Sequence, residues 1–270
     1  MPPAKKRTRS YDPAKTRAAV LAQFAHVRTA VDALTPEQLA LPTRLGAWTV
    51  RELAGHLAMA ATCVVRGAEA PAPTGPELAL ERWPSANRAH AQAAAIDPAT
   101  RELVARGPLG ELYARTADDL ARTLAATPDD RPVTTRLGAL RFADLLVTRT
   151  VELIVHTDDL NDALAAGRDA GPVPYDRGAL AACTRLLLDA LATAAPGGSV
   201  EVRVPPFAVV QCVEGPRHTR GTPPNVVETD PLTWIRLATG RTAWADAVDD
   251  AQVSASGERA DLSALLPLLG

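Results

Sequence analysis

The segment from Arg141 to Ala165 constrains the fold more than any other part of the sequence. It carries the longest helical pattern of the chain, and its apolar residues cover most sides of the predicted helix. A helix that is apolar on most sides is usually buried among other helices. We therefore expect a helical bundle in which residues 141–165 form the central helix.

Helix-start signals predict the neighbours of this central helix. Asp12 is followed by a proline, which is typical of an N-cap and a first turn. Thr49 and Glu52 fit a capping box, so a second helix begins after Thr49. A loop rich in proline and glycine is expected at residues 67–86. Further helices are expected at residues 85–95 and 109–126.

The pattern changes after a turn-rich stretch at residues 167–174. Beyond a helix expected at 176–194, Val200, Val202 and Val204 alternate with charged residues, which is typical of a half-buried strand. The other elements expected there are strands at 208–214, 225–228 and 253–256, a helix from Asp230 to Leu237 and a last helix at 261–269. This mixture of strands and helices predicts an α+β fold.

The chain is therefore expected to have several parts. We predict a disordered basic tail at residues 1–10, a helical bundle at 11–166 and a small α+β domain at 174–270. The formal net charge of −2 gives no electrostatic argument for nucleic acid as a partner. No apolar run reaches the ~20 residues that cross a bilayer. The three cysteines form no C-x-x-C pair, which favours a reducing cytoplasm.

Three residues suggest a metal site. Glu152 and His156 are four residues apart on the central helix, so their side chains point the same way. His56, on the helix that begins after Thr49, could be a third ligand. Three protein ligands leave one position open, as a catalytic zinc requires. A mutual hydrogen bond between the carboxylate and the imidazole would also offset the cost of burying them.

Taken together, two motifs resemble a known family. Trp-Thr-Val-Arg-Glu-Leu-Ala-Gly-His, which ends at His56, and Glu-Leu-Ile-Val-His, from Glu152 to His156, are similar to motifs of the mycothiol-dependent maleylpyruvate isomerases. These belong to the wider DinB-like group of metal-binding four-helix bundles. The resemblance implies that His56, Glu152 and His156 bind a divalent metal, usually zinc, and that mycothiol is the thiol cofactor.

The resemblance extends into the second part of the chain. Residues 230–241, which end in Gly-Arg, are similar to a stretch of that family's C-terminal domain, which itself resembles sterol-carrier-protein modules. Residues 209–228 are more similar to actinobacterial sterol carrier family proteins than to isomerases of known substrate. The expected fold class is thus multidomain, with a DinB-like four-helix bundle followed by a small sterol-carrier-like α+β domain.

Other residues are candidates for the chemistry beside the metal. Asp159 lies three residues after His156, and ligand histidines commonly donate their second N–H to a carboxylate. Arg236 and Arg241 are candidates to bind an anionic substrate across a cleft between the domains. The alternatives are that Asp158 and Asp159 are solvated surface charges and that both arginines have plain surface roles. Arg149 could pair with Glu152.

Two functions follow from these features. The first is an enzyme of the maleylpyruvate isomerase type that depends on a divalent metal and a low-molecular-weight thiol, and that adds a thiolate to a small electrophilic substrate. In the isomerases, addition permits rotation about a bond and elimination regenerates the thiol. The alternative is a sterol-carrier-like protein that binds an apolar ligand or lipid and has a non-catalytic metal site.

Overall fold

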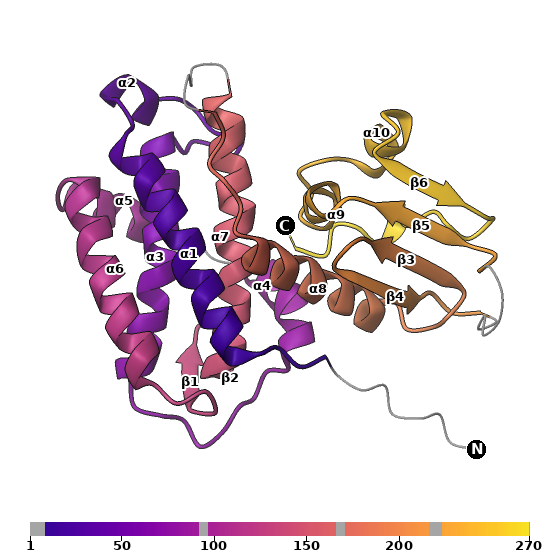
Figure 1. Ribbon diagram of the computed structural model, residues 1–270, viewed down its shortest axis with the longest axis horizontal. Helices are drawn as coiled ribbons and strands as arrows, with labels where there is room; N and C mark the ends of the chain where they lie inside the picture. The colour runs from indigo at the N-terminus through magenta and orange to yellow at the C-terminus, as the bar shows by residue number, and fades with distance from the viewer. Residues whose placement is uncertain (1–8, 92–96, 166–170, 216–222, 270) are drawn as a thin grey trace.

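The computed structural model describes residues 9–91, 97–165, 171–215 and 223–269. Four long helices form a bundle in the first part of the chain (Figure 1). They are α1 (Pro13–Asp32), α3 (Val50–Glu69), α6 (Leu109–Ala126) and α7 (Phe142–Leu164). The shorter elements of this part are α2 (Pro36–Leu39), η1 (Leu80–Arg82), α4 (Trp83–Ala91), α5 (Asp97–Ala105), β1 (Pro132–Thr135) and β2 (Gly138–Arg141). Residues 1–8 of the expected tail lie outside the described residues.

Helix α7 is the central helix, as its sequence predicts. Leu146, Val151 and Ile154, on different sides of this helix, are fully buried. It packs against α1, α3 and α8 (Arg177–Ala194). Because α7 is held from several sides, the functional side chains that it carries have fixed positions.

Helix α3 is held equally firmly. Its expected capping box is present, with the Thr49 backbone N–H donating to Glu52 Oε2 at 2.9 Å. Tyr113 on α6 is fully buried and donates its hydroxyl to the Ala54 carbonyl at 2.7 Å. Gly55 lets α5 approach closely, since a Cβ there would lie 2.2 Å from a side-chain atom of Val104. The backbone on either side of residue 55 is therefore fixed by its neighbours.

The second part of the chain contains a four-stranded sheet with the order β4-β3-β5-β6. Its strands are β3 (Val200–Val204), β4 (Ala208–Cys212), β5 (Val226–Thr229) and β6 (Val253–Ser256). Strands β3 and β5 are parallel, and the other two pairings are antiparallel. Helices α9 (Pro231–Ala238) and α10 (Trp244–Asp249) accompany the sheet (Figure 1). The expected four-helix bundle and small α+β part are both confirmed.

Some expected elements differ from the structure. The helix expected at residues 261–269 is wrong, since only a 3₁₀ turn, η2 (Ser263–Leu265), forms there. Pro267 removes a backbone donor and disfavours a helical conformation at the residue before it. The backbone amides of Leu268 and Leu269 bind the carbonyl of Ala238 instead. The β1–β2 hairpin, α5 and α10 were not expected from the sequence.

The two parts share an interface. Helix α8 contacts α1 and α7 of the bundle as well as β4 and α9 of the second part. The domain division expected at residues 167–174 stays a prediction, and residues 166–170 lie outside the described residues. Within the described ranges, no helix is long and apolar enough to cross a membrane.

Candidate metal centre

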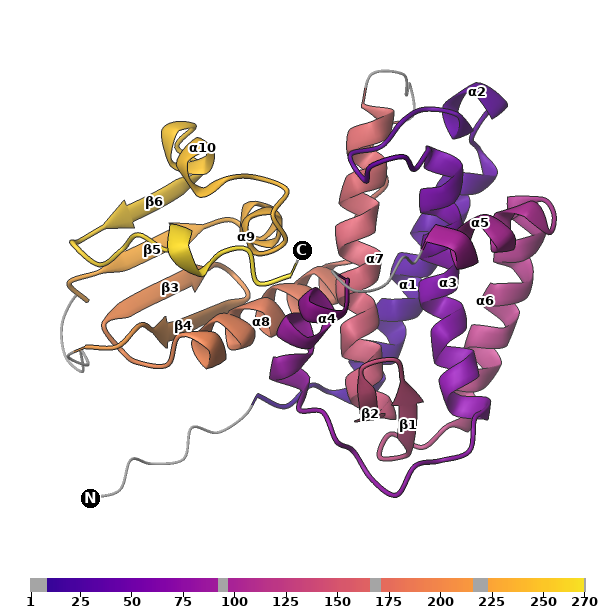
Figure 2. The same ribbon diagram turned by 180° about the vertical axis from the view of Figure 1, so that it is seen from behind.

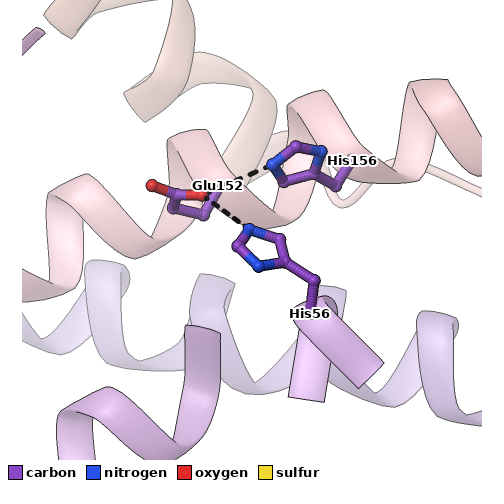
Figure 3. A group of neighbouring side chains, drawn as sticks. All are labelled: His56, Glu152 and His156. Carbon is purple, nitrogen blue, oxygen red and sulfur yellow. Dashed lines mark ion pairs between the residues drawn. The ribbon is translucent and has the colours of Figure 1, made fainter. Parts of the chain in front are cut away.

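His56, Glu152 and His156 come together between α3 and α7 (Figure 3). His56 Nε2 lies 3.6 Å from Glu152 Oε2, and His156 Nε2 lies 3.5 Å from the same oxygen. One donor atom from each residue lies within 4.8 Å of the other two. The side chains are only 10% to 14% exposed. The sequence predicted that Glu152 and His156 share a face of α7 and that His56 lies on α3. The fold brings these three side chains together.

The donor atoms have a spacing that fits a divalent ion. Distances of 3.5 and 3.6 Å are longer than ordinary N–H···O hydrogen bonds. Zinc–nitrogen and zinc–oxygen bonds of about 2.0–2.1 Å in a tetrahedron place the ligand atoms roughly 3.3 Å apart. Two imidazoles and one carboxylate are donors that zinc accepts in catalytic sites, with a fourth position left open. The arrangement therefore fits zinc or a similar ion.

The surroundings of the three donors set their protonation. Burial lowers the pKa of His56. Burial would raise the pKa of Glu152, but the close imidazoles of His156 and His56 and the charge of Arg149 hold it well below its usual range. Burial likewise opposes the charged form of His156, yet contacts with Asp159 and Glu152 raise its pKa. Glu152 is therefore ionised and His56 neutral at neutral pH, as metal ligands must be.

Asp159 orients His156 by contacting the ring nitrogen that does not face Glu152. Its side chain is fully buried, and Oδ2 lies 2.9 Å from His156 Nδ1. Arg241 donates to both carboxylate oxygens, from Nη2 at 2.8 Å and from Nε at 3.1 Å. The negative charge of Asp159 favours a proton on Nδ1 of His156, so Nε2, which faces Glu152, keeps a lone pair that can bind a metal. The alternative that Asp159 is a solvated surface charge is wrong.

Arg236 and Arg241 reach across to α7 from the second part of the chain. Arg236 donates to both oxygens of Asp158, at 2.7 and 2.9 Å, and Asp158 is only 2% exposed. Arg241 makes the corresponding pair with Asp159. Both guanidinium groups contact carboxylates of this chain, and neither is among the described residues that line the cavity beside the donors. Their expected contact with a substrate anion stays a prediction.

A cavity of about 700 Å³ adjoins the donor set. Three arginines line it, of which sequence reasoning had singled out only Arg149, whose Nη2 lies 3.8 Å from Glu152 Oε1. Arg66 was missed, although ten residues after His56 it lies near the same face of α3. Arg136 lies between the strands of a hairpin that the sequence did not predict. The loop expected at residues 67–86 is shorter in the structure, because α3 runs to Glu69 and helical turns begin again at Leu80, and its residue Ala70 lines the cavity.

Comparison with known proteins identifies the first part of the chain. Residues 20–161 match the sequence model of the mycothiol maleylpyruvate isomerase N-terminal domain, which is more than half of the chain. The chain belongs to this family. All three donors, and Asp159 beside them, lie within the matched residues. Residues 176–268 match a second family, described as a bacterial SCP ortholog.

Two crystal structures share the fold. One is the mycothiol-dependent maleylpyruvate isomerase, and the other is a mutant of that enzyme with alanine in place of a histidine. Each has a TM-score of 0.57 and 16% sequence identity, over 93% of this chain and 95% of that chain. The similarity thus extends over both parts of the maleylpyruvate isomerase fold. No curated protein sequence matches the chain.

Proposed function

We propose that this protein is an enzyme of the maleylpyruvate isomerase type that uses a divalent metal, zinc in the first instance, and a low-molecular-weight thiol, mycothiol. The observation that carries the proposal is the buried His56, Glu152 and His156 set beside a cavity large enough for a small-molecule substrate. Membership of the family supports the same reaction type. The reaction is the addition of a thiolate to an electrophilic carbon of the substrate.

The chain's own residues supply most of what this chemistry needs. A divalent ion at the site would act as a Lewis acid that lowers the pKa of a bound thiol. Asp159, held by Arg241, keeps His156 in the tautomer and orientation that a ligand requires. Arg149 lies beside Glu152 on the cavity wall, where its charge stabilises a negatively charged group of the substrate.

The match of residues 176–268 to a bacterial SCP ortholog supports a second candidate function, the binding of an apolar ligand or lipid by the C-terminal part. We favour the enzyme because Arg241 joins the second part to Asp159 and thereby to His156. The second part then has a role at the metal centre whether or not it binds a lipid.

The test is a screen of the zinc-loaded protein against a panel of electrophiles with mycothiol, followed by mass spectrometry of the products. We expect conjugation or isomerisation that requires both zinc and thiol. The matched control is Glu152→Gln, which keeps the size of the side chain and removes the charge of one ligand. Turnover that persists without metal or thiol would contradict the proposal, whereas lipid that co-purifies with an inactive protein would favour the second candidate.

A further inference from the structure

The cavity beside the donor set is elongated along α3. His56, Met59, Cys63, Arg66 and Ala70 line it at intervals of three or four residues, which places them along one face of the helix. At a rise of about 1.5 Å per residue, the ten residues from His56 to Arg66 span ~15 Å. The cavity therefore extends far beyond the donor atoms.

Helix α7 gives the same direction. Glu152, Arg149 and Leu145 line the cavity in steps of three and four residues toward the start of α7. At the end away from the donors, a Cβ on Gly67 would lie 3.6 Å from a side-chain atom of Leu145. Because Glu152 lies beside His56 and Leu145 lies close to Gly67, the two helices run antiparallel, with the β1–β2 hairpin near the start of α7 (Figure 2). The lining residues place the cavity between the two helices, from the donors to the hairpin residues Thr134 and Arg136.

The two ends of the cavity differ chemically from its walls. Arg149 lies beside Glu152 at the donor end, and most of the remaining wall is apolar, with Met59, Trp83 and Leu145 among its side chains. Beyond them lie Arg66 and Arg136, both exposed to solvent. Arg136 Nη2 donates to Asn87 Oδ1 on α4 at 2.6 Å, which holds one guanidinium group at this end. Among the described lining residues, Glu152 is the only acid.

We propose that this cavity binds an elongated anionic amphiphile, a carboxylate with a long apolar body. The carboxylate lies between Arg66 and Arg136, the apolar body lies along the walls, and the opposite end reaches His56 and Glu152. The inference rests on the proposed function in one respect only, namely that the end of the ligand near His56 and Glu152 is the end that reacts. A small dicarboxylate cannot contact both ends of a space in which Arg66 is ~15 Å from His56 along the helix.

Binding can be tested without turnover. Calorimetric titration of the zinc-loaded full-length protein with dodecanoate, in the absence of thiol, should show saturable binding at one site. Dodecyltrimethylammonium, which has the same tail and the opposite charge, should bind much more weakly, and so should maleate, a small dicarboxylate. Chelator-treated protein should keep its affinity for dodecanoate, because the carboxylate lies at the end away from the metal ligands.

Variants then locate the carboxylate. Arg66→Gln and Arg136→Gln should each weaken dodecanoate binding roughly tenfold, the effect of losing a hydrogen bond to a charged group. The matched control is Arg122→Gln, because Arg122 is an exposed arginine on α6 that pairs with Asp119 and is not a cavity residue. All three arginines are exposed, so folding and metal content should be unchanged, which circular dichroism and elemental analysis check.

Three results would overturn the inference. One is unchanged dodecanoate binding in the Arg66→Gln, Arg136→Gln double variant, which would place the ligand elsewhere, for example in residues 174–269. The second is equal binding of dodecanoate and dodecyltrimethylammonium. The third is loss of dodecanoate binding after metal removal, which would place the carboxylate at the donor set. Absence of thiol chemistry would count against the proposed function alone, because no thiol is present in these titrations.

Discussion

Replacement of Asp159 by asparagine tests how the second part of the chain supports the metal centre. Asp158 provides a matched control on the neighbouring position of α7. Each carboxylate accepts two hydrogen bonds from one arginine of the second part, Asp158 from Arg236 and Asp159 from Arg241. Only Asp159 also contacts His156. Both variants lose an ion pair with an arginine of the second part. Asp159→Asn also removes the charge beside His156 and Arg44, whereas Asp158→Asn keeps an oxygen that can accept from the Tyr175 hydroxyl.

The expected magnitudes follow from the burial of each pair. Asp159 is fully buried and the Arg241 side chain is 12% exposed, so Asp159→Asn leaves a nearly buried guanidinium without its counter-charge. Removing one partner of such a pair costs about 3 kcal/mol or more in the free energy of unfolding. Arg236 is 35% exposed, so solvent screening should limit the cost of Asp158→Asn to about 1 kcal/mol. Loss of a carboxylate that orients a ligand histidine typically weakens metal affinity 10–100-fold, or roughly 1.4–2.7 kcal/mol.

The assay is competitive titration of zinc against a chromophoric chelator, with urea denaturation of the metal-free proteins measured in parallel. Asp159→Asn should lose both stability and zinc affinity, and Asp158→Asn should lose stability alone. Equal zinc affinities in the two variants would refute the role of Asp159, because of the two carboxylates only Asp159 contacts His156. An unchanged free energy of unfolding in both variants would refute a stabilising role for the two arginine–aspartate pairs.

Three further predictions follow. Tyr113→Phe removes the buried hydrogen bond to Ala54 and should lower the free energy of unfolding, measured by urea denaturation, by about 1 kcal/mol. An unchanged free energy of unfolding would contradict this contact between α6 and α3. Contacts with Asp159 and Glu152 raise the pKa of His156, so a proton competes with the metal up to a higher pH than the ~6.5 of a free histidine. Zinc affinity should therefore fall as the pH decreases through that raised pKa, and an affinity that is constant between about pH 8 and pH 6 would argue against His156 as a ligand. Cys63 is exposed, whereas the other two cysteines are buried, so one thiol should react quickly with a thiol reagent and Cys63→Ser should abolish that fast phase.

The sequence predicted those parts of the site that depend on local spacing. Glu152 and His156 are four residues apart, and residues with this spacing share one face of a helix. The capping box that begins at Thr49 predicted where the helix that carries His56 starts. Asp159 was found by the same argument, since three residues also separate neighbours on a helix face. These inferences need only the geometry of one helix at a time.

Features that depend on tertiary packing could not be found in this way. Strands β1 and β2 have four residues each, too few for an alternating pattern to show, so Arg136 was not connected with the cavity. The pairing of Arg236 and Arg241 with carboxylates of α7 spans about 80 positions of sequence, and no local pattern records it. The last expected helix failed because the effect of Pro267 on the conformation of the residues before it outweighed an apolar pattern.

The central claim is that His56, Glu152 and His156 hold a divalent metal that has an open position for a thiol. Cobalt(II) in place of zinc makes both halves of this claim visible in one absorption spectrum. The cobalt-loaded protein should show the visible bands of a four- or five-coordinate ion, and added mycothiol should produce a sulfur-to-cobalt charge-transfer band in the near ultraviolet. His56→Ala should lose both signals. A wild-type protein that takes up no cobalt, or whose cobalt spectrum does not respond to mycothiol, would contradict the account.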